Sequence, residues 1–191
     1  MPDPHGRRAL GIADSSRSAW CTLAGAVVRG DRVVDGASFA TATVGGLDAT
    51  DAVLRIVAEL DREDIAALLL GTIAPAWYNV LDLDRLHEET RLPTVAVTFE
   101  ESDGLEQPLR EAFSGEALAR RLDRYRSLPP RHAVAVGTET VYVRAVGCAP
   151  SDVETLVTSF TPVGGRPEPI RVARQLARAG AAYREQALED V

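Results

Sequence analysis

Apolar segments separated by turn residues predict three strands in the first quarter of the chain. Each segment is rich in aliphatic residues and is bounded by Gly, Asp or Ser. The first strand is expected to end at the turn-prone Asp14-Ser15-Ser16, and Arg29-Gly30-Asp31-Arg32 carries a hairpin signal between the other two. The predicted strands are residues 8–13, 19–29 and 32–44.

A helix is predicted after Gly45-Gly46, which ends the third strand. Its apolar residues recur at helical spacing and therefore share one face. Asp48 or Thr50 is expected to cap its first turn, because short polar side chains accept hydrogen bonds from unpaired N–H groups there. The residues that set the period are Val53, Leu54, Val57 and Leu60.

The rest of the chain alternates buried strands with helices. Residues 65–70 and 94–98 are short and continuously apolar, as expected for strands that are covered on both faces. Ser151 and Glu154 form a capping-box pattern at the start of a helix. The other predicted elements are a loop at 71–79, a strand at 139–146, and helices at 82–89, 105–113, 116–125 and after Arg166-Pro167-Glu168-Pro169.

This order of elements predicts an α/β fold in one domain, residues 1–191. Three early strands with a hairpin precede helix, strand, helix and strand, and the chain then becomes mostly helical. A ribonuclease H-like mixed sheet covered by helices on its faces fits that order. A chain of 191 residues is of the size that forms a single core.

Composition narrows the classes of partner. The net charge is −7 and all 21 basic residues are arginine, which we interpret as codon bias plus adaptation to a salty cytosol. The alternative is a use in nucleic-acid binding, because arginine binds phosphate bidentately. Such a chain repels nucleic acid at long range, so a contact needs a local basic patch. No apolar run is long enough for a membrane span or a signal peptide, which predicts a cytoplasmic protein. Cys21 and Cys148 are expected to be free thiols there.

Three segments in order carry a resemblance to a known family. They are residues 43–50 (TVGGLDAT), 71–80 (GTIAPAWYNV) and 165–173 (GRPEPIRVA). Together they resemble the archaeal endonuclease dU family, also called domain-of-unknown-function family 99 or uncharacterised protein family 0215, which is related to endonuclease V. The resemblance covers roughly residues 7–180. It implies an endonuclease V-like fold and a DNA-repair nuclease that uses Mg²⁺ to nick DNA beside a deaminated base.

The same resemblance shows that the expected metal-binding carboxylates are replaced. Where the family has acids on the first strand, before Gly-Leu-Asp-Ala-Thr and at the end of the next buried strand, this chain has Ala13, Gly45 and Leu70. Two acids remain nearby as catalytic candidates, Asp14 and Asp48. Asp14 is a strand neighbour of Ala13, so it points to the opposite face unless a one-residue bulge turns it. We therefore assign no residue to metal binding, although the family implies Mg²⁺.

The last helix also lacks the metal-binding residue that the family resemblance implies. Endonuclease V has Asp after the Ala that corresponds to Ala173, and the dU branch often has histidine there, but this chain has Arg174. A cation at that position opposes metal binding by charge repulsion.

Two groups of residues are candidates for nucleic-acid binding. Trp77, Tyr78 and Asn79 lie in the loop after a buried strand, where aromatic rings can stack on a base or cover a core edge. The resemblance places a Gly-aromatic-Asn there, so Asn79 matches it and Trp77 departs from it. Arg166, Arg171 and Arg174 lie on or just before the last helix, and Arg178 continues their spacing. These arginines form either a phosphate-binding stripe or a solvated face on which Arg171 pairs with Glu168.

Three functions follow as alternatives. The first is a divergent endonuclease dU-like protein that binds nucleic acid and has a degraded metal site, with weak or no cleavage. The second is an active Mg²⁺-dependent enzyme that uses Asp14, Asp48 and either Asp82 or Asp84, which requires two carboxylates within about 4–6 Å of each other. The third is a non-catalytic protein-interaction or regulatory module, which would not bind DNA even at low salt.

Overall fold

The computed structural model describes residues 6–189; the remainder of the predicted domain, residues 1–5 and 190–191, lies outside the described part. A seven-stranded sheet with the order β3-β2-β1-β4-β5-β7-β6 forms its centre. β1, β4 and β5 are parallel, and the other neighbouring pairs are antiparallel. The strands are β1 (Arg8–Arg17), β2 (Trp20–Arg29), β3 (Val34–Thr43), β4 (Ile65–Leu70), β5 (Thr94–Thr98), β6 (His132–Val136) and β7 (Glu139–Val146).

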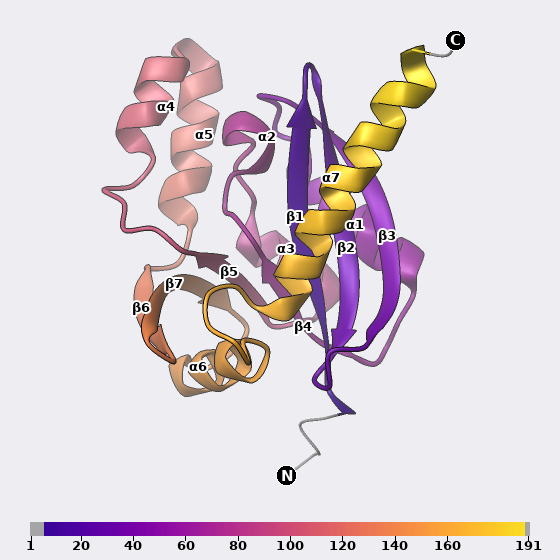
Figure 1. Ribbon diagram of the computed structural model, residues 1–191. Coiled ribbons are helices and arrows are strands. Elements are labelled where there is room, and N and C mark those ends of the chain that lie inside the picture. The colour runs from indigo at the N-terminus through magenta and orange to yellow at the C-terminus, as the bar shows by residue number, and fades with distance from the viewer. Residues whose placement is uncertain (1–5, 190–191) are drawn as a thin grey trace.

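Helices cover both faces of this sheet, which confirms the predicted mixed α/β architecture (Figure 1). One face packs against α1 and α3 in a core that includes Leu10, Leu23, Ile56 and Leu86. The other face packs against α6 and α7, and α7 runs along β1 and β2. The helices are α1 (Ala49–Leu60), α2 (Pro75–Tyr78), α3 (Leu83–Thr90), α4 (Glu106–Ala112), α5 (Gly115–Ser127), α6 (Pro150–Ser159) and α7 (Glu168–Glu189).

The first strand is longer than its sequence predicts. The expected turn at Asp14-Ser15-Ser16 is wrong, because these residues continue β1 and pair with β2 without a shift in register. The chain reverses instead after Arg17, which pairs with Trp20, and Ser18 takes a left-handed backbone with φ of 52°. The predicted hairpin at residues 29–32 is confirmed between β2 and β3.

In the second half of the chain, strand β6 was not predicted and the start of α6 differs from its prediction. β6 pairs with β7 through a turn at Gly137, where φ is 62°. The predicted capping box is wrong, because α6 begins at Pro150 and the residue before it, Ala149, offers no side-chain cap. Pro at a first helical position needs no N–H partner, so it starts the helix without the box.

Close packing of α7 on the sheet depends on a glycine. A Cβ atom at Gly11 would lie 2.1 Å from the carbonyl carbon of Pro169, so only glycine lets the helix approach β1 this closely. This approach brings the first turn of α7, which contains Arg171, against β1 in the sheet.

The expected free thiols are confirmed for Cys21, which is buried, and Cys148, which is half-buried. Among the residues that the structure describes, no helix combines the length and the apolar content that crossing a membrane requires.

Candidate nucleic-acid site

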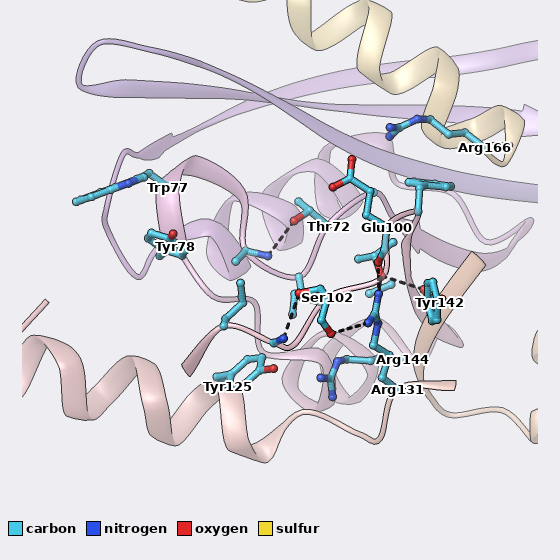
Figure 2. A pocket seen from close by; sticks show the side chains of 18 residues that line it. Thr72, Trp77, Tyr78, Glu100, Ser102, Tyr125, Arg131, Tyr142, Arg144 and Arg166 are labelled. Atoms are coloured by element: carbon cyan, nitrogen blue, oxygen red, sulfur yellow. Dashed lines mark hydrogen bonds between the residues drawn. The ribbon is translucent and has the colours of Figure 1, made fainter. Parts of the chain in front are cut away.

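A cavity of about 400 Å³ lies beside the ends of β4 and β5, between the loop that follows β4, helix α5, and Arg166. Figure 2 shows Trp77 and Tyr78 at one end of this pocket and Arg166 and Tyr142 at the other. Its wall combines aromatic rings with guanidinium groups. The residues concerned are Trp77, Tyr78, Phe99, Tyr125, Tyr142, Arg131, Arg144 and Arg166.

Each arginine of the wall stacks on an aromatic ring. The guanidinium carbon lies 4.0 Å from the ring centre for Arg131 over Tyr142, and 5.5 Å for Arg144 over Tyr125. For Arg166 over Phe99 the distance is 4.2 Å. Stacking on a ring holds the plane of a guanidinium in place and leaves its edge free to donate hydrogen bonds. Of these wall arginines, Arg166 alone is among the residues predicted from the sequence.

The loop after β4 has an unusual backbone. The consecutive residues Ala76, Trp77 and Tyr78 have φ of 51°, 54° and 64°, a left-handed backbone conformation that residues other than glycine rarely adopt. The Trp77 side chain is 55% exposed, and its ring centre lies 5.1 Å from that of Phe113. Strained segments of this kind concentrate at ligand-binding sites. The loop therefore presents a large aromatic surface to solvent at the pocket.

Asn79 ties this loop to the end of β3 and the start of α1. Its Oδ1 accepts from the Ala49 N–H at 2.9 Å, and its Nδ2 donates to the Thr43 carbonyl and to Asp48 Oδ1 at 3.0 and 2.7 Å. Its exposure is 0%. The predicted contact of Asn79 with nucleic acid is therefore wrong, because every polar atom of this buried side chain already has a partner in the fold.

Asp48 occupies the N-cap position of α1, but its carboxylate does not cap the helix. It accepts instead from Asn79 and from the N–H and hydroxyl of Thr43, and Asn79 takes over the cap by accepting from Ala49. Burial opposes ionisation of Asp48, but the hydrogen bonds from Asn79 and Thr43 outweigh it and hold the pKa of this carboxyl below its usual value. Thr50, the alternative predicted cap, accepts from the Asp82 N–H.

Asp14 is engaged on the face of β1 that meets the loop after β4. Its Oδ2 accepts from the Ala76 N–H at 3.3 Å and lies 3.7 Å from Cys21 Sγ. Burial, followed by the Asp14 charge as a smaller cause, raises the pKa of the Cys21 thiol to about 11. Because the pairing of β1 with β2 is continuous at Asp14, no bulge turns its carboxylate toward the face of Ala13.

Ala13 lies in an apolar cluster under α7. It packs with Ala26, Val28 and Ala173, and all four side chains are at most 7% exposed. Leu70 belongs to the core on the opposite face of the sheet, where it pairs with Ile12. Two of the three positions expected to hold acids in the family therefore point to different sides of the sheet in this chain.

Gly45, the third such position, is held by an arginine. Its φ is 70°, and its carbonyl accepts from Arg121, whose guanidinium also donates to the Gly46 carbonyl. Arg121 is only 4% exposed and stacks over Phe113 with 3.9 Å between the guanidinium carbon and the ring centre. Burial, and then the charges of Arg120 and Arg124, lower the pKa of Arg121. The environment of Gly45 is thus cationic.

These residues do not fit a divalent cation. In the described part of the chain no three Asp, Glu, His or Cys side chains gather as a metal site would require. Asp82 accepts from the Arg85 N–H as the cap of α3, and Asp84 follows in the first turn of that helix. A hard cation such as Mg²⁺ needs several oxygen ligands, and here apolar groups and guanidiniums lie where the family resemblance implies carboxylates.

The arginines at the start of α7 fall into two groups. Arg171 forms an ion pair with Glu168 through hydrogen bonds of 2.7 and 2.5 Å, which matches the alternative of a solvated face. Arg166 borders the pocket, and its pKa is lowered by burial and then by the charges of Arg174 and Arg178. The predicted stripe is therefore divided, with Arg171 neutralised and Arg166 close to two like charges.

Comparison with known proteins gives the family. The family model described as Endonuclease dU matches residues 5–180. A UPF0215 protein of Pyrobaculum aerophilum is 32% identical over 174 residues, which cover 89% of this chain and 92% of the relative. The crystal structure of a protein of unknown function from Archaeoglobus fulgidus is 30% identical, with a TM-score of 0.81 over 91% of this chain and 97% of that one.

The fold extends to endonuclease V. The structure of Ciona intestinalis endonuclease V in complex with a 24mer DNA containing an inosine superimposes with a TM-score of 0.62. The match covers 93% of this chain and 86% of that one at 12% identity, so it is a likeness of fold. The mixed sheet is thus endonuclease V-like, as expected, and the chain belongs to the Endonuclease dU family.

Proposed function

We propose that this member of the Endonuclease dU family binds nucleic acid, has a degraded metal site, and cleaves its ligand weakly or not at all. The packing of Ala13 against Ala26, Val28 and Ala173 carries the proposal, because apolar side chains fill the place beneath α7 where a carboxylate is expected. Without converging carboxylates the chain lacks the charge that would hold the two-metal clamp of a phosphodiesterase.

Binding is supported by the shape and chemistry of the pocket. Its volume of about 400 Å³ lies within the range of sites that enclose small ligands. Exposed Trp77 borders it and can stack on a base, while arginines supply charge for phosphates. These features favour nucleic acid over the alternative of a pure protein-interaction module.

The proposed ligand is DNA with a deaminated base. The endonuclease V of similar fold binds a DNA that contains an inosine, and the family name refers to an endonuclease. A role in DNA repair in the cytoplasm is part of the same proposal. Mg²⁺ is the cofactor that the family implies, and the described residues do not supply its ligands.

A binding and a nicking assay on the same oligonucleotides test this function. Fluorescence anisotropy at low salt with EDTA measures affinity for DNA containing deoxyuridine, deoxyinosine or normal bases. Trp77→Ala is expected to weaken binding by about 1–3 kcal/mol, the value of one stacked base. Trp20→Ala is the matched control, because Trp20 is similarly exposed at 51% but lies outside the pocket.

Nicking with Mg²⁺ or Mn²⁺ then separates the degraded site from the alternative enzyme. We expect little or no cutting by the unmodified protein with either metal, at a level no higher than in EDTA. Robust Mg²⁺-dependent cutting that Asp14→Asn or Asp48→Asn abolishes would instead establish the active enzyme. Absence of any DNA binding at low salt would refute the nucleic-acid function itself.

A further inference from the structure

We infer that Arg166, Arg174 and Arg178 form a phosphate-binding site that works without a divalent cation and holds backbone phosphates of a nucleic acid at the edge of the aromatic pocket. The inference rests on the proposed nucleic-acid function and adds to it the group that is bound and the residues that bind it.

In the part of the chain that the structure describes, the three arginines have no ion pair with an acid. Arg171 on the same helix is, in contrast, paired with Glu168. Arginines elsewhere pair with acids in the same way, at positions 8, 17, 29, 62, 85, 110 and 126. Other arginines of the described residues also have no ion pair, so the absence of a partner only leaves these three guanidiniums available. What favours an external anion is their position together at the edge of the aromatic pocket.

Geometry brings the three together. Arg174 and Arg178 are four residues apart on α7 and lie on one face, about 6 Å along the axis. Arg166 lies two residues before the helix, where its guanidinium stacks on Phe99 and borders the pocket (Figure 2). The stack fixes the plane of the Arg166 guanidinium, and none of its N–H groups has a hydrogen-bond partner among the described residues.

Electrostatics point to an anion rather than a metal. Burial lowers the pKa of Arg166, and the charges of Arg174 and Arg178 lower it further, while Glu100 acts in the opposite direction. A bound phosphate would relieve this repulsion between like charges, whereas a divalent cation would increase it. Since Arg174 directly follows Ala173, which packs on Ala13, the cationic group lies next to the place where the family resemblance implies carboxylates.

Salt dependence measures how many phosphates the site neutralises. Each phosphate that an arginine neutralises contributes about 0.7 to the slope of log K against log salt for a single strand, and about 0.9 for a duplex. The experiment records anisotropy of a labelled oligodeoxynucleotide, single-stranded and duplex, over a series of salt concentrations in EDTA. The proteins are the unmodified chain and Arg166→Ala, Arg174→Ala, Arg178→Ala and Arg171→Ala.

We expect each of the first three variants to lower the slope by the value of about one phosphate and the affinity by about 5- to 10-fold. Arg171→Ala removes the same charge from the same helix but is expected to leave the slope unchanged, because Arg171 binds Glu168 and no phosphate, and to lower the affinity much less, because the uncovered Glu168 charge acts on the phosphates only at long range. Arg174→Lys should retain the slope, since the charge remains, and Glu100→Gln should tighten binding about twofold by removing an acid whose charge acts on Arg166.

Several outcomes would overturn the inference. If the unmodified protein binds and the three alanine variants bind equally well, or if Arg171→Ala costs as much as they do, the nucleic-acid function stands and the phosphate site is refuted. A requirement for Mg²⁺ at constant ionic strength would also refute it. If the unmodified protein binds no oligonucleotide at low salt, both the inference and the proposed function fail. Far-UV circular dichroism of each variant confirms that it is folded.

Discussion

Replacing Asn79 tests whether its three hydrogen bonds hold the site together. In Asn79→Ala the buried Ala49 N–H loses its acceptor, and Asp48 loses the donor at 2.7 Å. The Thr43 carbonyl keeps a second donor, the Gly46 N–H at 3.0 Å, so the effect there is small. An unsatisfied buried N–H costs about 1–3 kcal/mol and a bond to a charged group about 1.5–3 kcal/mol. The expected decrease in the free energy of unfolding is therefore about 3–5 kcal/mol.

Asn79→Asp separates hydrogen bonding from packing. The new side chain has nearly the same shape and retains an acceptor for Ala49, but it places a second carboxylate against Asp48. Like charges raise the pKa values of the pair above the unfolded value of about 3.9, so the folded state binds protons more readily. Stability of this variant should thus rise as the pH is lowered from 7 to 5. The unmodified protein should instead lose the Asp48 contribution only below about pH 4, since the pKa of that carboxyl is lowered.

Denaturant unfolding followed by circular dichroism at pH 7 and pH 5 measures these differences. The reasoning would be refuted if Asn79→Ala cost less than about 1 kcal/mol, the net value of one ordinary hydrogen bond. It would equally be refuted if Asn79→Asp showed the same pH dependence as Asn79→Ala, because the carboxylate pair would then not be coupled.

Two further predictions concern the packing of β1 and β2. Gly11→Ala should destabilise the chain by about 1–3 kcal/mol or more in the same unfolding assay, since its Cβ would overlap Pro169, whereas Gly6→Ala, with nothing within 4 Å, should change little. In thiol labelling with a disulfide reagent at pH 8, only Cys148 should react in the folded protein, because Cys21 is fully buried and its pKa is raised to about 11. A second reactive thiol should appear only on unfolding. Rapid labelling of Cys21 in the folded protein would contradict its burial.

The sequence predicts strands whose apolar composition reflects their burial, and it misses segments that become strands only by pairing with a neighbouring strand. β4 and β5 are apolar because helices cover both of their faces, and their boundaries agree with the prediction. The extension of β1 through Asp14 and Ser16 has no apolar signal of its own, because pairing with β2 is what makes it a strand. β6 does carry an apolar run of strand length, Ala133-Val134-Ala135-Val136, that could have identified it.

The candidate site is less predictable, because its contacts join distant segments. Arg166 stacks on Phe99 across 67 positions of the chain, and Arg121 holds the carbonyl of Gly45 across 76. Neither pair has a spacing that a local pattern can detect. Asn79 is a different case. The loop motif correctly marks it as important, but only its burial and its hydrogen bonds show that it supports the fold.

The replacements at the expected metal positions have one electrostatic explanation. Carboxylates that share a cation repel one another once the cation is absent, because two like charges a few ångströms apart in a partly buried place destabilise the fold. Replacement of one ligand would weaken metal binding and leave the remaining acids unfavourable, so apolar residues such as Ala13 would then stabilise the chain. With those acids replaced, a guanidinium at Arg174 remains available to an anion. On the proposed function, the site that neutralised phosphate through a metal would neutralise it through arginine, which retains binding and removes the means of activating water.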